Sequence, residues 1–303
     1  MLFTDDGAGR LRLRDGDTTL AEYVYLPTEP ALESPRPYLS LTSRAGIDVT
    51  AYRPDDHVWH KGLSLALPVV GAHNFWGGPT YIHGEGYIQL PNNGAQSHRS
   101  FLPSPDGAVA RVDETLDWVA ESGDLVLSEA RTLTARIVDG ETWALTWRSA
   151  LRNVSGAAVG FGSPTSKGRP NAGYAGIFWR GPVSFTGGEI VGPGGTVGDA
   201  ARGEPGPWLA FASPERDAGV VMLDASDAAA SPPWFARSEE YAGLNPAPFF
   251  YDETVLSDGD TLILAAVILI GAADVAAHAA SAGAALVAEV RSASTPSTLE
   301  ELS

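Results

Sequence analysis

The stretch DLVLSEARTLTARIVDGETWALTWRSALRNV, residues 124–154, decides the fold class. Apolar and polar side chains alternate through most of its two halves, which are rich in residues that favour extended chain. Between the halves, VDGE at residues 138–141 contains an Asp-Gly turn signal. The stretch therefore predicts two long antiparallel strands joined by a tight hairpin.

Runs of the same character recur along the chain at short spacing, without helical segments between most of them. They are TTLAEYVYL (18–26), PYLSLTS (37–43), LSLALPV (63–69), AVARVDETLDWVA (108–120), GVVMLDA (219–225) and TLILAAVILI (261–270). About fifteen strands are expected in all, which is too many for one flat sheet. The sequence therefore predicts an all-β fold, a large antiparallel β-sandwich in which two sheets pack face to face.

The C-terminal region contains the only convincing helical periodicity. Residues 262–288 are apolar enough to resemble a membrane span, but Asp274 and His278 lie near their middle. A charge at such a position costs about 3 kcal/mol in a bilayer. We therefore expect a buried strand over residues 261–270, followed by a short C-terminal helix over residues 273–291.

No shift in composition marks a domain boundary along the chain, and no internal repeat is visible. Residues 1–295 are therefore predicted to form a single β-sandwich domain, since undivided sandwiches of this length are common. The last eight residues, PSTLEELS at 296–303, are predicted to be a flexible C-terminal tail.

The composition excludes several classes of partner. The chain carries 37 acidic and 20 basic residues, a formal net charge of −17 at pH 7, which repels nucleic acid and anionic membranes. It contains no cysteine, so disulfides, thiolate chemistry and cysteine-based zinc sites are excluded.

Charged residues occupy the N-terminal positions where a signal peptide needs an apolar segment, which favours a cytoplasmic location. The sequence does not indicate an oligomeric state.

The motifs of several familiar enzyme classes are absent. No G-x-G-x-x-G follows a strand, no H-E-x-x-H occurs, and GSPTSKG at 162–168 lacks the glycine spacing of a phosphate loop. GLSLA at 62–66 lacks the second glycine of a nucleophile elbow. No nucleotide cofactor is therefore expected.

Five of the six histidines fall within residues 57–98, and this concentration is the strongest functional signal. His57, His60 and His98 are the predicted catalytic residues, because imidazoles that share one sheet face can donate and accept protons near neutral pH. The same three side chains could instead hold a zinc or other divalent ion, and the sequence leaves both readings open. His83 and Glu85, two positions apart, are expected to share one face of a strand.

The residues around these histidines indicate the class of ligand. Aromatic rings and amides are interleaved there, and flat rings stack on the C–H faces of sugars while polar groups bond to the hydroxyls. Two further segments, FWR at 178–180 and WFAR at 234–237, each end in an arginine that could hold an oxygen. The predicted substrate-binding residues are Trp59, Lys61, Asn74, Trp76, His83, Glu85, Arg180 and Arg237.

Three segments carry a resemblance to a known family. RPYLSLTSRAGIDVTAYRPDDHVWHKGLSLALPVVGAHNFWGGPTY (36–81), GRPNAGYAGIFWRGP (168–182) and PWFARSEEYAGLNPAPFFYDE (233–253) resemble, in this order, the blocks of the PmoA-like family of bacterial proteins of unknown function. The family's name refers to a methane monooxygenase subunit that is an integral membrane protein, and nothing in this sequence supports that activity. The resemblance implies a relation to the galactose-mutarotase-like supersandwich and a place among sugar-catabolism proteins.

TWRSALRNVSGAAVGFG (146–162) also resembles a strand–turn–strand unit of that superfold. Mutarotases continue this unit with a histidine, whereas this chain continues with SPTSKGR, so the usual mutarotase pair of His and Glu is not expected. Any proton relay must then come from His57, His60 or His98.

The sequence thus leaves three functional hypotheses. The first is a cytoplasmic carbohydrate-active enzyme that acts on a sugar, keto-sugar or glycoside by histidine-mediated proton transfer, in epimerisation or elimination. The second is a non-catalytic sugar-binding or sensing protein, and the third is a metal-dependent lyase or hydrolase.

Overall fold

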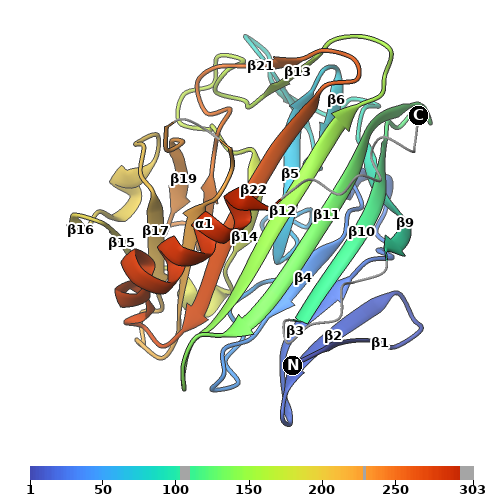
Figure 1. The fold of residues 1–303 in the computed structure, drawn as a ribbon. Helices are drawn as coiled ribbons and strands as arrows, with labels where there is room; N and C mark the ends of the chain where they lie inside the picture. The colour runs from blue at the N-terminus through green and yellow to red at the C-terminus, as the bar shows by residue number, and fades with distance from the viewer. Residues whose placement is uncertain (103–109, 228–229, 294–303) are drawn as a thin grey trace.

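The computed structural model describes residues 1–102, 110–227 and 230–293, and the predicted tail at 296–303 lies outside these residues. Within them the chain forms two large β-sheets that pack face to face, as Figure 1 shows. Every pairing between the named strands is antiparallel. The predicted all-β sandwich is confirmed.

The first sheet has eleven strands in the described residues, and its main path runs β1-β2-β3-β4-β5-β14-β20-β19, with β6, β13 and β21 paired beside it. The bounds of its strands are β1 Phe3–Asp5, β2 Arg10–Asp15, β3 Thr18–Val24, β4 Tyr38–Leu41, β5 Leu63–Val70, β6 His73–Phe75, β13 Val159–Gly162, β14 Gly176–Arg180, β19 Trp234–Arg237, β20 Gly243–Pro246 and β21 Thr254–Leu256.

The second sheet has nine strands in the described part of the chain, in the order β16-β15-β17-β18-β22-β12-β11-β10-β9. Their bounds are β9 Ala95–Leu102, β10 Ala110–Val119, β11 Leu125–Ile137, β12 Trp143–Asn153, β15 Glu189–Gly192, β16 Gly195–Thr196, β17 Trp208–Ala212, β18 Gly219–Asp224 and β22 Thr261–Gly271. A separate hairpin pairs β7 (Thr80–Ile82) with β8 (Gly86–Ile88).

The stretch at 124–154 forms the long hairpin β11–β12, as its pattern predicts. The two strands pair without interruption from Leu127↔Asn153 to Ile137↔Trp143. The carboxylate of Asp139 accepts hydrogen bonds from the backbone N–H groups of Glu141 and Thr142, which closes the turn.

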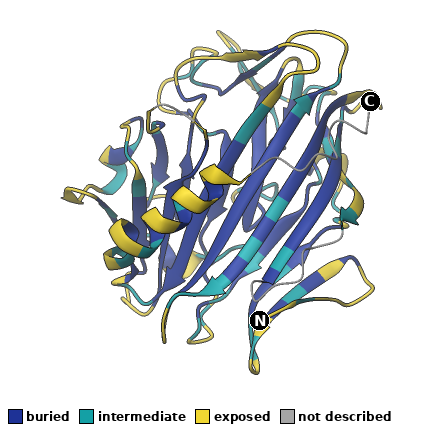
Figure 2. Cartoon of the chain, viewed as in Figure 1, coloured by how far each residue is buried: buried dark blue, intermediate teal, exposed yellow. Residues whose placement is uncertain are grey.

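The main core lies between the two sheets, and the central strands of both sheets are buried along most of their length (Figure 2). Alternation places successive side chains on opposite faces. In β14, Ile177 and Trp179 pack in the main core, whereas Phe178 belongs to a separate apolar cluster with Phe235 and Tyr241. That second cluster marks the outer face of the eleven-stranded sheet.

The predicted C-terminal helix covers the outer face of the other sheet. A 3₁₀ turn at Val275–His278 and a π turn at Ala279–Gly283 lead into α1, Ala284–Ser292, which lies across β18 and β22 in Figure 1. A Cβ on Gly283 would lie 2.9 Å from Leu223, so the close approach of this segment to β18 depends on glycine. In the described residues, no helix has the length and apolar character that crossing a membrane requires.

The structure also contains two 3₁₀ turns that shape the loops near the eleven-stranded sheet, η1 at Ala31–Glu33 and η2 at Val183–Phe185. A third, η3 at Gly198–Ala201, packs against β19. Residues 72–94 and 162–207 thus consist of short strands and turns.

Candidate active site

A cavity of about 350 Å³ opens on the outer face of the eleven-stranded sheet. The loops before β5 and β14, the loop between β6 and β7, strand β8, and β19 with the turn that follows it supply its lining residues. It is lined by His57, Trp59, His60, Trp76, Gly77, Pro79, Tyr87, Arg169, Tyr174, Phe235, Arg237, Glu240 and Tyr241. The volume falls within the range of about 300–1,000 Å³ that is usual for small-molecule sites.

Two tight turns bring His57 and His60 together. The backbone N–H of His57 bonds to the carbonyl of Pro54 at 3.0 Å, and that of His60 bonds to the carbonyl of His57 at 2.9 Å. The two imidazole rings stack in parallel, with their centroids 4.5 Å apart and their planes 6° apart. His60 is buried, and the side chain of His57 is 35% exposed.

Arg180, at the end of β14, lies beneath this pair and fixes both rings. Its Nη2 donates to both carboxylate oxygens of Asp56, at 2.8 and 2.9 Å, and its Nη1 lies 3.1 Å from Nδ1 of His60. Asp56 Oδ2 in turn lies 2.8 Å from Nδ1 of His57. The guanidinium also packs on the ring of Tyr241, at 4.0 Å from its centroid.

These partners determine the tautomer of each ring. A guanidinium has no acceptor, so Nδ1 of His60 must accept, and its proton is on Nε2. A carboxylate has no proton to donate, so Nδ1 of His57 must donate, and its Nε2 carries a lone pair. Within the described residues, neither Nε2 atom has a hydrogen-bond partner. The cavity wall thus presents a proton acceptor next to a hydrogen-bond donor.

The surroundings of both rings favour their neutral form. Burial lowers the pKa of His60 well below its ordinary value, and the charge of Arg180, together with that of His57 when it is protonated, lowers this pKa further. Burial also lowers the pKa of His57, although Asp56 opposes this effect. A neutral imidazole at neutral pH is the form that a general base requires.

Aromatic rings form most of the remaining wall. Trp76 lies 4.5 Å from Tyr174 and edge-on to His60 at 5.6 Å, measured between ring centroids. Trp59 packs on Gly77 and Gly78, both at positive φ, where an added Cβ would lie 2.6 and 2.8 Å from Trp59. The glycines of FWGG therefore allow the indole of Trp59 to lie directly on the backbone.

Arg36 holds the two loops that carry these tryptophans. It is buried, and it donates hydrogen bonds to the carbonyls of Trp59 at 2.7 Å and of Trp76 at 2.9 Å. It also bonds to the hydroxyl of Ser64 in β5 at 3.1 Å. A single side chain thus ties both tryptophan backbones to the sheet.

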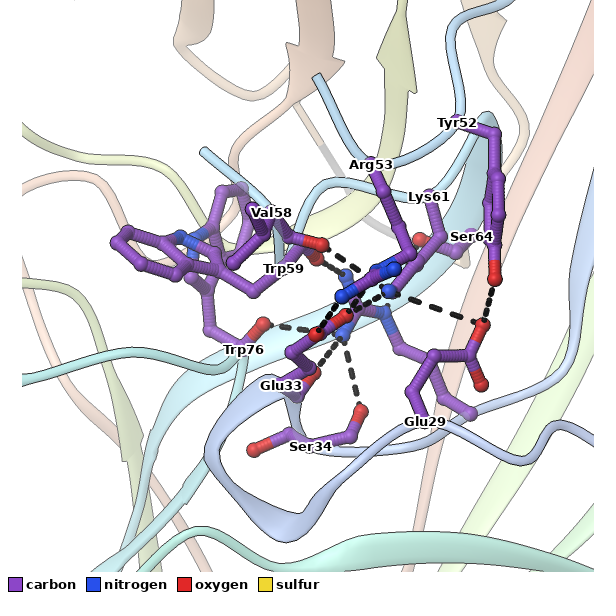
Figure 3. Close-up of polar contacts among 11 residues, drawn as sticks. Glu29, Glu33, Ser34, Tyr52, Arg53, Val58, Trp59, Lys61, Ser64 and Trp76 are labelled. Carbon is purple, nitrogen blue, oxygen red and sulfur yellow. Dashed lines mark hydrogen bonds and ion pairs between the residues drawn. The ribbon is translucent and has the colours of Figure 1, made fainter. Parts of the chain in front are cut away.

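Lys61 does not line the cavity, so the prediction that it binds substrate is wrong. Its side chain is 1% exposed and forms an ion pair with Glu33, as Figure 3 shows. Arg53 also pairs with Glu33, at 2.7 Å (Figure 3). The chain uses Lys61 to anchor the loop of residues 53–60, since burial of one unpaired charge would be costly.

Three other predicted binding residues lie outside the cavity as well. Asn74 is buried, and its Oδ1 accepts the backbone N–H groups of Trp76 and Gly77, so its role is to shape the loop. His83 and Glu85 do not share a strand face, because both lie in the exposed turn of the β7–β8 hairpin. The two glycines around Glu85 favour that turn over a continuous strand.

His98 is not part of this site, and the expectation that three histidines meet is wrong. It lies on β9, where its Nδ1 is 2.6 Å from Glu114 and its ring contacts Tyr25 and Phe101. Glu114 faces a buried polar cluster between the sheets, in which Arg131 pairs with Glu129 at 2.7 Å. In the part of the chain that the structure describes, no group of three His, Asp or Glu side chains is arranged to hold a metal ion.

Of the predicted residues, the cavity brings together His57, His60, Trp59, Trp76 and Arg237, with Arg180 beneath them. The sequence reasoning missed Asp56, Arg36, Tyr241 and Arg169. Asp56 could have been predicted from the sequence PDDH, because a carboxylate directly before His57 can orient its ring. The others are distant in sequence, and only the pairing of β5, β14 and β20 brings their loops together.

Comparisons with known proteins give a family and a distant likeness to solved structures. The fold is similar to that of the GH36 α-galactosidase AgaA from Geobacillus stearothermophilus in complex with raffinose, with 11% sequence identity and a TM-score of 0.44. The match covers 86% of this chain but 40% of that enzyme, so the chain spans less than half of its length. A comparison with curated proteins gives no match. The model of DUF6807, described as a family of unknown function, matches residues 10–285, and the chain belongs to this family.

Proposed function

We propose that this protein is a carbohydrate-active enzyme that transfers protons on a sugar through His57 and His60. The observation that carries the proposal is the pair of opposite tautomers imposed by Arg180 and Asp56. One ring offers a lone pair and the other a proton, on one wall of the same cavity. A pair of this kind suits a carbon acid next to a carbonyl group.

In the proposed reaction, Nε2 of His57 removes a proton from the carbon next to the carbonyl. The electrons of the C–H bond form a carbon–carbon double bond, and the carbonyl π electrons move to oxygen. The Nε2–H group of His60 donates a hydrogen bond to this oxyanion and stabilises it. If the planar intermediate turns over in the cavity, return of the proton from His57 to its opposite face gives epimerisation. Departure of a hydroxyl group from the next carbon, which takes that proton and leaves as water, gives elimination.

The lining of the cavity supports a sugar as the ligand. Six aromatic side chains face it, interleaved with two arginines and a glutamate: Trp59, Trp76, Tyr87, Tyr174, Phe235 and Tyr241, with Arg169, Arg237 and Glu240. Rings stack on the C–H faces of a sugar, and charged groups bond to its hydroxyls.

The test is hydrogen exchange from the substrate. Keto-sugars and sugar acids are incubated with the protein in D₂O, and ¹H NMR follows loss of the signal next to the carbonyl. The wild-type protein is expected to exchange this proton with at least one of them, and His57→Gln is expected to abolish the exchange. His278→Gln, which changes a histidine paired with Asp139 outside the cavity, is the control and should retain it.

A non-catalytic sugar-binding protein is the second candidate, favoured by the same aromatic lining. It predicts binding by calorimetry with an unchanged NMR spectrum of the ligand, and that result would replace the catalytic proposal. The cytoplasmic location stays a prediction of the sequence.

A further inference from the structure

We infer that the substrate is a sugar acid whose carboxylate binds Arg169, at the end of the cavity away from His57 and His60. This inference rests on the proposed function and names its substrate class. Two arginines, Arg169 and Arg237, line the cavity, and a third, Arg180, contacts His60. Two of these three are neutralised, since Arg180 pairs with Asp56 and Arg237 pairs with Glu240.

Arg169 is the exception. Among the described residues it forms no ion pair, although the chain carries 37 acidic against 20 basic residues. An arginine that lines a cavity without an acidic partner, in a chain of net charge −17, leaves one positive charge for the ligand to neutralise.

The guanidinium of Arg169 is already held in place. Its Nη1 donates to the hydroxyl of Tyr87, and the group lies over the Tyr87 ring at 4.7 Å from the centroid. The Tyr87 hydroxyl also meets that of Tyr174, at 2.7 Å. Within the described residues, Nε and Nη2 of Arg169 have no hydrogen-bond partner. These two groups form the planar edge that binds a carboxylate through two parallel hydrogen bonds.

Aromatic rings separate this edge from the histidines. The ring of His60 contacts that of Trp76, and the ring of Trp76 contacts that of Tyr174. The hydroxyl of Tyr174 forms a hydrogen bond with that of Tyr87, which lies beside Arg169. A ligand that bonds to Arg169 and reaches His57 must therefore carry its carboxylate and its reacting carbonyl at opposite ends. An open-chain hexuronic acid, with a carboxylate at one end and a carbonyl at the other, has this arrangement.

A phosphate group would also present negative charge to Arg169. A phosphate dianion is usually bound by several donors, such as a set of backbone N–H groups or a lysine as well as an arginine. The cavity offers one free arginine edge, and no lysine is among the residues that line it in the described chain. These observations favour a carboxylate.

The experiment measures binding by calorimetry to matched pairs: glucuronate and glucose, and galacturonate and galactose, with glucose 6-phosphate as a third arm. The wild-type protein is expected to bind one uronate at least tenfold more tightly than its neutral partner. Arg169→Gln should reduce that affinity about ten- to a hundredfold, the usual effect of losing a charge-assisted hydrogen bond pair. It should reduce the affinity for the neutral sugar by a clearly smaller factor.

Arg216→Gln is the matched control, because Arg216 is 60% exposed and lies outside the cavity. It should bind like the wild type. Equal binding of uronate and neutral sugar, preference for the phosphate, absence of uronate binding, or an unchanged affinity in Arg169→Gln overturns the inference. Exchange in D₂O without a uronate preference would refute only the substrate class, whereas uronate preference without exchange would refute only the catalysis.

Discussion

The imidazole rings of His57 and His60 lie parallel with their centroids 4.5 Å apart, yet their Nδ1 atoms face partners of opposite character. Arg180 donates to one ring, and the carboxylate that Arg180 holds accepts from the other. Because stacked rings repel each other when both are charged, the pair can hold at most one added proton at ordinary pH. That proton belongs on His57, which is the ring next to a carboxylate.

Asp56→Asn should strongly slow proton transfer while leaving the fold intact. The amide cannot stabilise the protonated His57 ring as the carboxylate does, so the exchange rate in D₂O should fall about a hundredfold or more. Asp56 has a side chain 43% exposed, so the melting temperature should change by only a few degrees. Asp55→Asn, an exposed neighbour, is the control. A variant that keeps the wild-type rate would show that Asp56 does not orient the base.

Stability should fall as the pH drops below about 6.5, the ordinary pKa of histidine in an unfolded chain. Burial holds the pKa of His60 below that value in the folded protein, so the unfolded state binds protons first. Above pH 6.5 the neutral His60 makes its full contribution to the free energy of unfolding. As the pH falls below 6.5, this contribution decreases by at most about 1.4 kcal/mol per pH unit. Urea unfolding at pH 7.5, 6.5 and 5.5 measures it, and His60→Gln should flatten the dependence. An identical slope in that variant would mean that other groups cause it.

Gly78→Ala should disturb the binding site more than Gly84→Ala. Both glycines have positive φ, +68° and +82°, so each substitution strains the backbone by about 1 kcal/mol. At Gly78, however, the new Cβ would lie 2.8 Å from the indole of Trp59, whereas at Gly84 it meets nothing within 4 Å. Denaturation and calorimetry should show an extra loss of about 1–3 kcal/mol and weaker ligand binding for Gly78→Ala only. Equal behaviour of the two variants would mean that Trp59 has room to move.

His98→Gln should lower stability without affecting proton transfer. The imidazole is 14% exposed and bonds to Glu114, which is fully buried, so its replacement should cost about 1–3 kcal/mol of unfolding free energy. Exchange in D₂O at a temperature where the variant is folded should match the wild type. Loss of exchange with unchanged stability would place His98 in the active site after all.

The fold could be predicted from the sequence because alternation is a local signal. Each of the runs quoted above contains a strand, from Thr18–Val24 to Thr261–Gly271, since half-buried strands require apolar residues at every second position. The sequence also predicts the C-terminal helix, but the predicted start at residue 273 is too early, because α1 begins at Ala284. Residues 275–283 form 3₁₀ and π turns there, where Gly283 packs against Leu223.

The site could be predicted only where its residues are neighbours in sequence. His57, Trp59 and His60 lie within four positions of one loop, so the sequence alone shows that they are close together. His98 lies on a strand of the other sheet, and no local pattern shows which face of the sandwich a strand residue reaches. Lys61 follows His60 directly, but the buried Glu33 that neutralises it is 28 positions away.

The most direct test of the central claim is the protonation state of the two rings. Long-range ¹H–¹⁵N spectra of the protein with ¹⁵N-labelled histidine, at pH 7.5, report which nitrogen of each ring carries the proton, and the His57→Gln and His60→Gln variants assign the signals. We predict two neutral rings, with the proton on Nδ1 in His57 and on Nε2 in His60. The same tautomer in both rings, or a doubly protonated ring at that pH, would contradict the account.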